Sequence, residues 1–256
     1  MKQGVINFLD RLGFIVFTKR TIQSYKTSQL EKFHPSLEGK GSFLKACENG
    51  GLRAKLLAEN KTKWLEIGCG GTFDDYFTYV DLFPETLVDK KGSYYRLDIA
   101  NASESALEKL GKFDLIRMQH VFEHFSPEAG LTVLKNCAKL LNNDGYILIS
   151  TPDLKKYVNL YTSGKIRDSF DWALNRISSD SPNSFYFSIF THSLPNEKHE
   201  WCYDAEGLIY QLERAEMFKN IREITLDDEL ANIPFTHNRP NEDVCVIGQM
   251  KRVNLY

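Results

Sequence analysis

The sequence predicts an α/β fold with a mostly parallel central sheet. Residues 64–71 form a short apolar run that ends in an acidic residue and glycines, as a buried parallel strand does at its carboxyl end. From there to about residue 153, segments with strand-like and helix-like patterns alternate, which is typical of such a sheet. The chain has 256 residues, of which 42% are hydrophobic, and can therefore bury a core of its own.

Three helix boundaries can be predicted from capping residues. Ser42 is expected to cap a helix that continues to about Ala58 and covers one face of the sheet. Ser126 is followed directly by Pro127, and a serine cap before a proline is typical of a helix start. Asp204 is expected to cap a helix that ends near Ala215.

Strands and flanking segments complete the predicted order. Residues 146–150 form a strand, and residues 221–226 and 244–250 are expected to pair as an antiparallel hairpin. Residues 1–38 are predicted to be an N-terminal helical appendage, and residues 39–256 a single domain. Within that domain, residues 154–200 break the alternation and are rich in aromatic side chains. They are predicted to form an inserted cap over the ligand crevice, or else a hydrophobic cluster that stabilises its own loop.

The N-terminal segment leaves several interpretations open. Its apolar residues can share one helical face, but Asp10 and Arg11 interrupt them, which disfavours a signal peptide. A helix docked on its own protein or on a second subunit, as in a homodimer, is favoured over peripheral membrane contact. No stretch approaches the ~20 apolar residues that cross a bilayer.

Charge and cysteine content exclude several classes of protein. A net charge of -2 and a pI near 6.3 do not suit binding to a nucleic-acid backbone. The five cysteines are scattered without a close pair, which indicates a reducing compartment with neither a disulfide framework nor a zinc knuckle. We therefore expect a cytoplasmic protein.

The glycines after the first predicted strand indicate a nucleoside ligand. Gly68 and Gly70 fit the start of a dinucleotide motif, but its third glycine is replaced by Phe73, so a pyrophosphate is disfavoured. Asp81 and Asp98 each close a later strand, where one carboxylate can bind ribose hydroxyls and the other an adenine amino group. The alternative is that both are ordinary polar loop residues.

Four segments in this order resemble the class I S-adenosylmethionine-dependent methyltransferases. They are residues 65–71, residues 80–84, residues 113–125 together with 140–153, and residues 199–204 with the helix that follows. The second segment, Val80-Asp-Leu-Phe-Pro84, is similar to a subgroup found in bacterial surface-polysaccharide loci. The resemblance implies a Rossmann-like, seven-stranded, mostly parallel sheet with one antiparallel strand and helices on both faces.

The same resemblance implies S-adenosyl-L-methionine as the cofactor and assigns residues to it. Glu66, Gly68 and Gly70 shape the pocket for its methionine part. Asp81 binds the ribose and Asp98 lies near the adenine. Gln119 and His120 face the cofactor near the transferred methyl group.

Catalytic candidates follow from the expected acceptor, a hydroxyl on a small or saccharide-linked molecule. Removing its proton calls for a base near neutral pH, and His199 and His124 are the candidates, with His199 preferred. Alternatively, His199 bonds only the backbone of the cap, and His124 only holds its turn.

The sequence does not predict a metal site. The pattern His120-x-x-Glu123-His124 has the form of a metalloprotease signature, but a new helix begins at Ser126, too soon for that site. It also resembles the Glu-x-x-Glu-His metal site of ubiquinone-pathway O-methyltransferases, with His120 replacing the first acid.

Two other functions are alternatives to a sugar O-methyltransferase. One is a catalytically silent domain that binds the cofactor or a partner within a polysaccharide assembly complex. The other is an NAD-dependent sugar oxidoreductase, which Phe73 disfavours.

Overall fold

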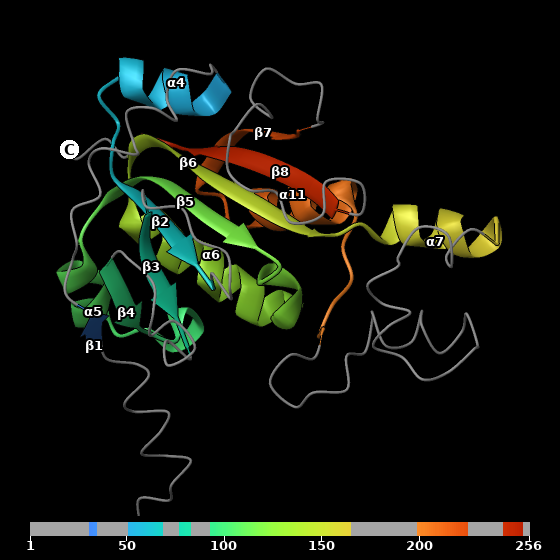
Figure 1. Cartoon of the computed structure of the whole chain (residues 1–256), viewed down its shortest axis with the longest axis horizontal. Helices are drawn as coiled ribbons and strands as arrows, with labels where there is room; N and C mark the ends of the chain where they lie inside the picture. The colour runs from blue at the N-terminus through green and yellow to red at the C-terminus, as the bar shows by residue number, and fades with distance from the viewer. Residues whose placement is uncertain are drawn as a thin grey trace, which may run out of the picture.

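A computed structural model describes residues 31–34, 51–68, 77–82, 93–164, 199–224 and 243–252, and the statements below concern these residues. They form one sheet with helices packed against it (Figure 1). The strands, in chain order, are β1 (Glu31–His34), β2 (Trp64–Ile67), β3 (Phe77–Asp81), β4 (Ser93–Arg96), β5 (Phe113–Gln119), β6 (Leu141–Pro152), β7 (Phe218–Glu223) and β8 (Asp243–Met250).

The predicted mostly parallel sheet is confirmed. Its order is β1-β4-β3-β2-β5-β6-β8-β7. The five strands β2 to β6 are all parallel to one another. β8 is the reversed strand, because it pairs antiparallel with both β6 and β7. The expected C-terminal hairpin is thus present, with β7 beginning three residues earlier than predicted, at Phe218.

One strand was not predicted. Residues 31–34 belong to the segment expected to be a helical appendage, but they pair antiparallel with β4. Without β1, β4 would be an open edge with unpaired backbone groups, and the added strand satisfies them. The seven predicted strands are present as β2 to β8, and β1 adds an eighth at the edge, so the predicted helix is wrong for these four residues. Residues 1–30, which carry the predicted apolar helix face, lie outside the described residues.

Two of the three predicted helix starts, at Ser126 and Asp204, are confirmed, whereas Ser42 lies outside the described residues. The described helices are α4 (Gly51–Ala58), η3 (Ile99–Asn101), α5 (Glu104–Leu110), η4 (Phe122–His124), α6 (Pro127–Leu140), α7 (Leu154–Thr162) and α11 (Ala205–Arg214). The Ser126 hydroxyl accepts the Ala129 N–H at 3.3 Å, and the Asp204 carboxylate accepts the Gly207 N–H at 2.8 Å. Both caps satisfy a donor that the first helical turn leaves unpaired.

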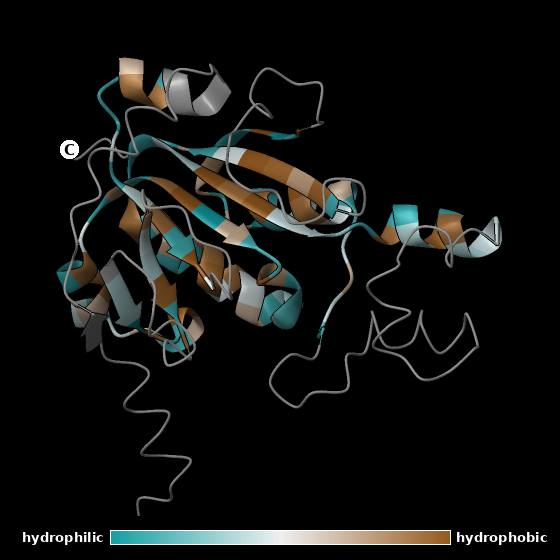
Figure 2. Cartoon of the chain, in the orientation of Figure 1, coloured by the Kyte–Doolittle hydropathy of each residue, from teal (hydrophilic) through white to brown (hydrophobic). Residues whose placement is uncertain are grey.

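Helices cover both faces of the sheet, as expected. The larger hydrophobic core joins one sheet face to α5, α6 and α11, through residues such as Leu107, Leu134 and Leu212. The smaller core lies on the other face and includes Leu56 of α4, the described end of the helix predicted from Ser42. Figure 2 shows the apolar residues concentrated along the strands of the sheet.

Only the first part of the predicted cap is described. α7 follows β6 directly and extends away from the sheet (Figure 1). Tyr157 is fully buried, whereas Tyr161 is 43% exposed. Residues 165–198 lie outside the described residues, so the aromatic cap stays a prediction. None of the helices in the described ranges is long and apolar enough to cross a membrane.

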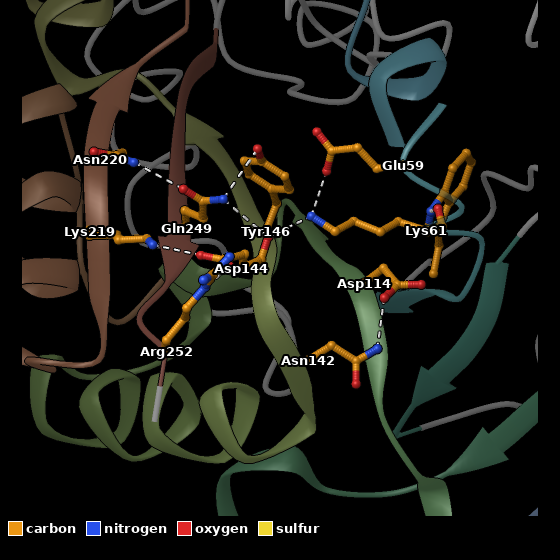
Figure 3. Close-up of polar contacts among 11 residues, drawn as sticks. Glu59, Lys61, Asp114, Asn142, Asp144, Tyr146, Lys219, Asn220, Gln249 and Arg252 are labelled. Atoms are coloured by element: carbon orange, nitrogen blue, oxygen red, sulfur yellow. Dashed lines mark hydrogen bonds and ion pairs between the residues drawn. The ribbon is translucent and has the colours of Figure 1, made fainter. Parts of the chain in front are cut away.

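Asp144 connects several elements at the end of the sheet that lies away from the predicted site. Lys219 donates to its carboxylate at 2.6 Å, and Arg252 donates to the other carboxylate oxygen (Figure 3). Its backbone carbonyl accepts from Lys61 and Gln249, each at 3.2 Å. These contacts join the start of β6 to β7, to the end of β8 and to the segment before β2.

Replacing Asp144 by asparagine is expected to lower the free energy of unfolding at neutral pH by about 1 kcal/mol, since both ion pairs are partly exposed. Asparagine tolerates the positive φ of 58° at this position, so the backbone is preserved. The hydrogen bonds from Lys219 and Arg252 hold the pKa of Asp144 below its usual value. A carboxyl group with a lowered pKa stabilises the fold above about pH 4 and loses this effect as the pH falls further.

Urea denaturation of the wild type and the Asp144→Asn variant between pH 3 and 7 checks this. The difference between them should be largest at pH 7 and shrink below about pH 4. A difference that does not change with pH would contradict the role given to the carboxylate charge.

Candidate active site

The strand order changes direction between β2 and β5, so the ligand crevice is expected at the carboxyl ends of these strands. After β2, the chain builds β3 and β4 on one side and then crosses to β5 on the other side of β2. Ligands of open α/β sheets bind at such a change of direction. Gly68 follows β2 and His120 follows β5, so both lie at this edge.

Gly68 is a position that only glycine suits. Its φ is +68°, and a Cβ built there would lie 2.4 Å from Cγ2 of Val121. Its N–H donates to the Val80 carbonyl at 2.7 Å, which extends the pairing of β2 with β3. The turn after β2 thus packs directly against the turn after β5. Gly70, the second predicted cofactor glycine, lies outside the described residues.

Glu66 forms a buried ion pair with Arg117. Glu66 and Arg117 are register partners on β2 and β5, and the Arg117 Nε donates to the Glu66 carboxylate. Their side chains are 3% and 4% exposed, and the guanidinium carbon lies 4.7 Å from the centre of the Phe77 ring. The predicted role of Glu66 toward the methionine part stays a prediction, and its described contact is with Arg117.

The two predicted adenosyl carboxylates lie at the same edge of the sheet. Asp81 ends β3, and Asp98 follows β4, the next strand in the sheet. Asp98 caps η3, because its carboxylate accepts from the N–H groups of Ala100 at 3.0 Å and Asn101 at 3.3 Å. It therefore has a structural role. Binding of ribose by Asp81 and of adenine by Asp98 stays a prediction.

His120 is held between two acids. It follows the predicted cofactor residue Gln119, has a φ of 53°, and its N–H donates to the Ser150 carbonyl at 2.9 Å. Its Nε2 lies 2.8 Å from the fully buried Asp243 carboxylate, and its Nδ1 lies 3.4 Å from Oε1 of Glu123. The ring therefore bridges β8 and η4 beside the crevice.

Two carboxylates make His120 a cation. Burial lowers its pKa, but the hydrogen bond to Asp243 and the contact with Glu123 outweigh this and raise the pKa to about 9. For Glu123, burial raises the pKa, and the contact with His120 outweighs it and lowers the pKa. At neutral pH His120 is therefore protonated and cannot accept a proton from a substrate.

The structure brings the two catalytic candidates together. The rings of His124 and His199 lie 5.0 Å apart, centre to centre, and meet edge to face at 71°. The Glu123 carbonyl accepts the N–H groups of Glu200 at 2.8 Å and Trp201 at 3.1 Å. These two hydrogen bonds fix the segment that carries His199 against η4, directly beside His124.

The sequence analysis did not assign roles to three polar residues near the site. Arg117 could have been noticed, because it is a charged residue inside a strand whose residues are all buried. Glu123 was noticed only as part of a metal-like pattern, although its carboxylate faces three histidines. Asp243 gave no local signal, because its contact with His120 spans 123 positions in the chain.

A family model described as a methyltransferase domain matches residues 42–216. The chain belongs to this methyltransferase family. The match contains β2 to β6, α11 and every predicted site residue. No curated protein sequence matches at a significant level.

Several solved methyltransferases are similar to this chain at low sequence identity. The apo methyltransferase SibL is 15% identical over 76% of this chain, with a TM-score of 0.46, and this chain covers 52% of SibL, about half its length. A methyltransferase from Archaeoglobus fulgidus is 16% identical, with coverage of 82% and 99% and a TM-score of 0.43. The N-methyltransferase NodS from Bradyrhizobium japonicum, bound to S-adenosyl-L-homocysteine, is 14% identical, with coverage of 85% and 89% and a TM-score of 0.43.

The strand ends of this methyltransferase suit S-adenosyl-L-methionine, the cofactor that the sequence resemblance implies. Asp81 ends β3 and Asp98 follows the adjacent strand β4, and carboxylates are suited to the hydroxyl and amino groups of an adenosyl ligand. When bound, the cofactor supplies an activated methyl group on a sulfonium.

Proposed function

We propose that this methyltransferase methylates a hydroxyl group on a small or saccharide-linked acceptor. The observation that carries the proposal is the His124–His199 pair, held beside η4 at the crevice edge. Because His120 is protonated, this pair is the group available in the described site for activating a hydroxyl. The saccharide class is supported only by the resemblance of residues 80–84 to methyltransferases of polysaccharide loci.

In the proposed reaction, the acceptor oxygen attacks the methyl carbon in line with the bond to sulfur. The carbon–sulfur bond breaks and its electrons stay on sulfur, giving the neutral thioether S-adenosyl-L-homocysteine. The hydroxyl proton passes to the His124–His199 pair, with His199 as the preferred acceptor. The protein contributes mainly by aligning the two reactants and excluding water.

Calorimetry and a transfer assay test the proposal. The full chain should bind S-adenosyl-L-homocysteine and not NAD, and should transfer methyl groups to at least one member of a panel of nucleotide sugars. His199→Ala should keep the affinity for S-adenosyl-L-homocysteine and lose about 10²- to 10⁴-fold in kcat. Glu200→Gln changes the exposed neighbouring residue and should keep both properties.

Methylation of amines but no hydroxyls would overturn the acceptor class. Full activity of His199→Ala would overturn the role of the histidine pair. Binding of NAD in place of S-adenosyl-L-homocysteine would favour the oxidoreductase.

The second candidate is a catalytically silent cofactor-binding or scaffold domain in a polysaccharide assembly complex. Trp201 is 50% exposed and Tyr210 is 61% exposed, and large aromatic side chains on a surface suit contact with a partner. Binding of S-adenosyl-L-homocysteine without turnover on any acceptor would favour this candidate. A cytoplasmic location, a homodimer and membrane contact through residues 1–20 remain predictions.

A further inference from the structure

Glu123, His124 and His199 together have the composition of a metal-binding site. One donor atom from each side chain lies within 4.8 Å of the other two. Ligands about 2.0–2.2 Å from a shared metal ion lie roughly 3–3.5 Å from one another, so the three donor atoms must move closer together to share one ion. The set differs from the sequence pattern considered at first, because His120 contacts Asp243 and the remote His199 joins instead.

The Glu123 carboxylate is an independent indication. Its side chain is only 2% exposed, and among the described residues neither carboxylate oxygen accepts a hydrogen bond. A buried carboxylate without such bonds is costly unless cations balance it. His120 faces only Oε1, at 3.4 Å, and His124 and His199 offer donor atoms that could share a second cation with the carboxylate.

The backbone holds this set in place. Glu123 and His124 are consecutive residues of η4, and the Glu123 carbonyl accepts two N–H groups from residues 200 and 201. Residues next to His199 are thereby fixed to the residue that supplies the carboxylate. Ligands from two distant parts of the chain are thus oriented before any metal binds.

We propose that Glu123, His124 and His199 bind one divalent first-row transition metal ion, with zinc as the reference. Two imidazoles and one carboxylate suit such an ion, whereas Mg²⁺ and Ca²⁺ prefer oxygen ligands. Three protein ligands leave a coordination position open. This position lies beside the crevice proposed to hold the methyl donor.

This step rests on the proposed function. The metal, and not the His124–His199 pair as a base, would activate the acceptor hydroxyl. Its open position binds the acceptor hydroxyl and lowers the pKa of that group, so the proton leaves to water and the bound oxygen attacks the methyl carbon. His199 then acts as a ligand and not as the base.

The binding test uses the full chain after dialysis against a chelator. Titration with Zn²⁺ by calorimetry, and with Co²⁺ by visible absorption, should give one ion per chain. Mg²⁺ should bind more weakly. His199→Ala and His124→Ala should each weaken Zn²⁺ binding at least tenfold, whereas Glu200→Gln should leave it unchanged. Circular dichroism confirms that each variant is folded.

Three results would overturn the metal site. They are a wild type that binds no Zn²⁺, a His199→Ala variant that binds it with unchanged affinity, and a Glu200→Gln variant that loses as much affinity as His199→Ala. S-adenosyl-L-homocysteine binding and methyl transfer are measured on the same samples with and without Zn²⁺. Metal binding without turnover contradicts the proposed function alone, and metal-independent turnover contradicts activation by the metal.

Discussion

Replacing Arg117 by methionine should destabilise the protein by about 3–5 kcal/mol, because it leaves the Glu66 carboxylate buried without its cation. Methionine has a similar length and can pack on the Phe77 ring, so little of the loss should come from packing. Urea denaturation monitored by circular dichroism measures the change in the free energy of unfolding.

A double-mutant cycle separates charge from packing. Glu66→Gln alone should also be strongly destabilising, because the buried Arg117 guanidinium then loses the negative charge of Glu66. The double variant Glu66→Gln with Arg117→Met should recover most of the loss and unfold within about 1–2 kcal/mol of the wild type. Single losses that simply add would show that the two side chains contribute independently and would contradict the pairing.

Gly68→Ala should disrupt the cofactor crevice. The positive φ costs a residue with a Cβ about 1–2 kcal/mol, and the contact at 2.4 Å with Val121 adds a packing cost of about 1–3 kcal/mol. Either Gly68 or Val121 must move, and both line the turns at the ends of β2 and β5. We expect a loss of about 2–5 kcal/mol in stability and at least tenfold in affinity for S-adenosyl-L-homocysteine.

Gly164 provides a matched control. Its φ is +69°, nearly that of Gly68, but a Cβ there would meet nothing within 4 Å. Gly164→Ala should therefore show the φ cost alone, about 1–2 kcal/mol, and unchanged affinity for S-adenosyl-L-homocysteine. Equal effects of the two substitutions on cofactor affinity would contradict the importance of the contact with Val121.

The raised pKa of His120 excludes this histidine as the base that accepts a proton from the acceptor. His120 was predicted to face the cofactor, and its two acidic neighbours keep it cationic at neutral pH. The proposed function therefore assigns activation of the acceptor to His124 and His199. The metal experiment decides whether these two act through a free imidazole or as ligands.

The sequence by itself determined the local elements and their order. Ser126 and Asp204 set helix starts, and the run before Gly68 set a buried strand, because capping, glycine conformation and apolar patterning act between residues that are close in the chain. The resemblance to methyltransferases rested on the same local motifs and is confirmed by the match to residues 42–216, whereas the polysaccharide-locus subgroup stays a prediction.

Only the tertiary structure decided which distant side chains meet. Arg117 reaches Glu66, Asp243 reaches His120, and His199 reaches His124 through backbone bonds that no local pattern records. β1 likewise depends on an open sheet edge that exists only once β4 is in place. These pairings are set by strand order and register, which bring together residues far apart in the chain, so the charge states and the candidate metal ligands became visible only in the folded protein.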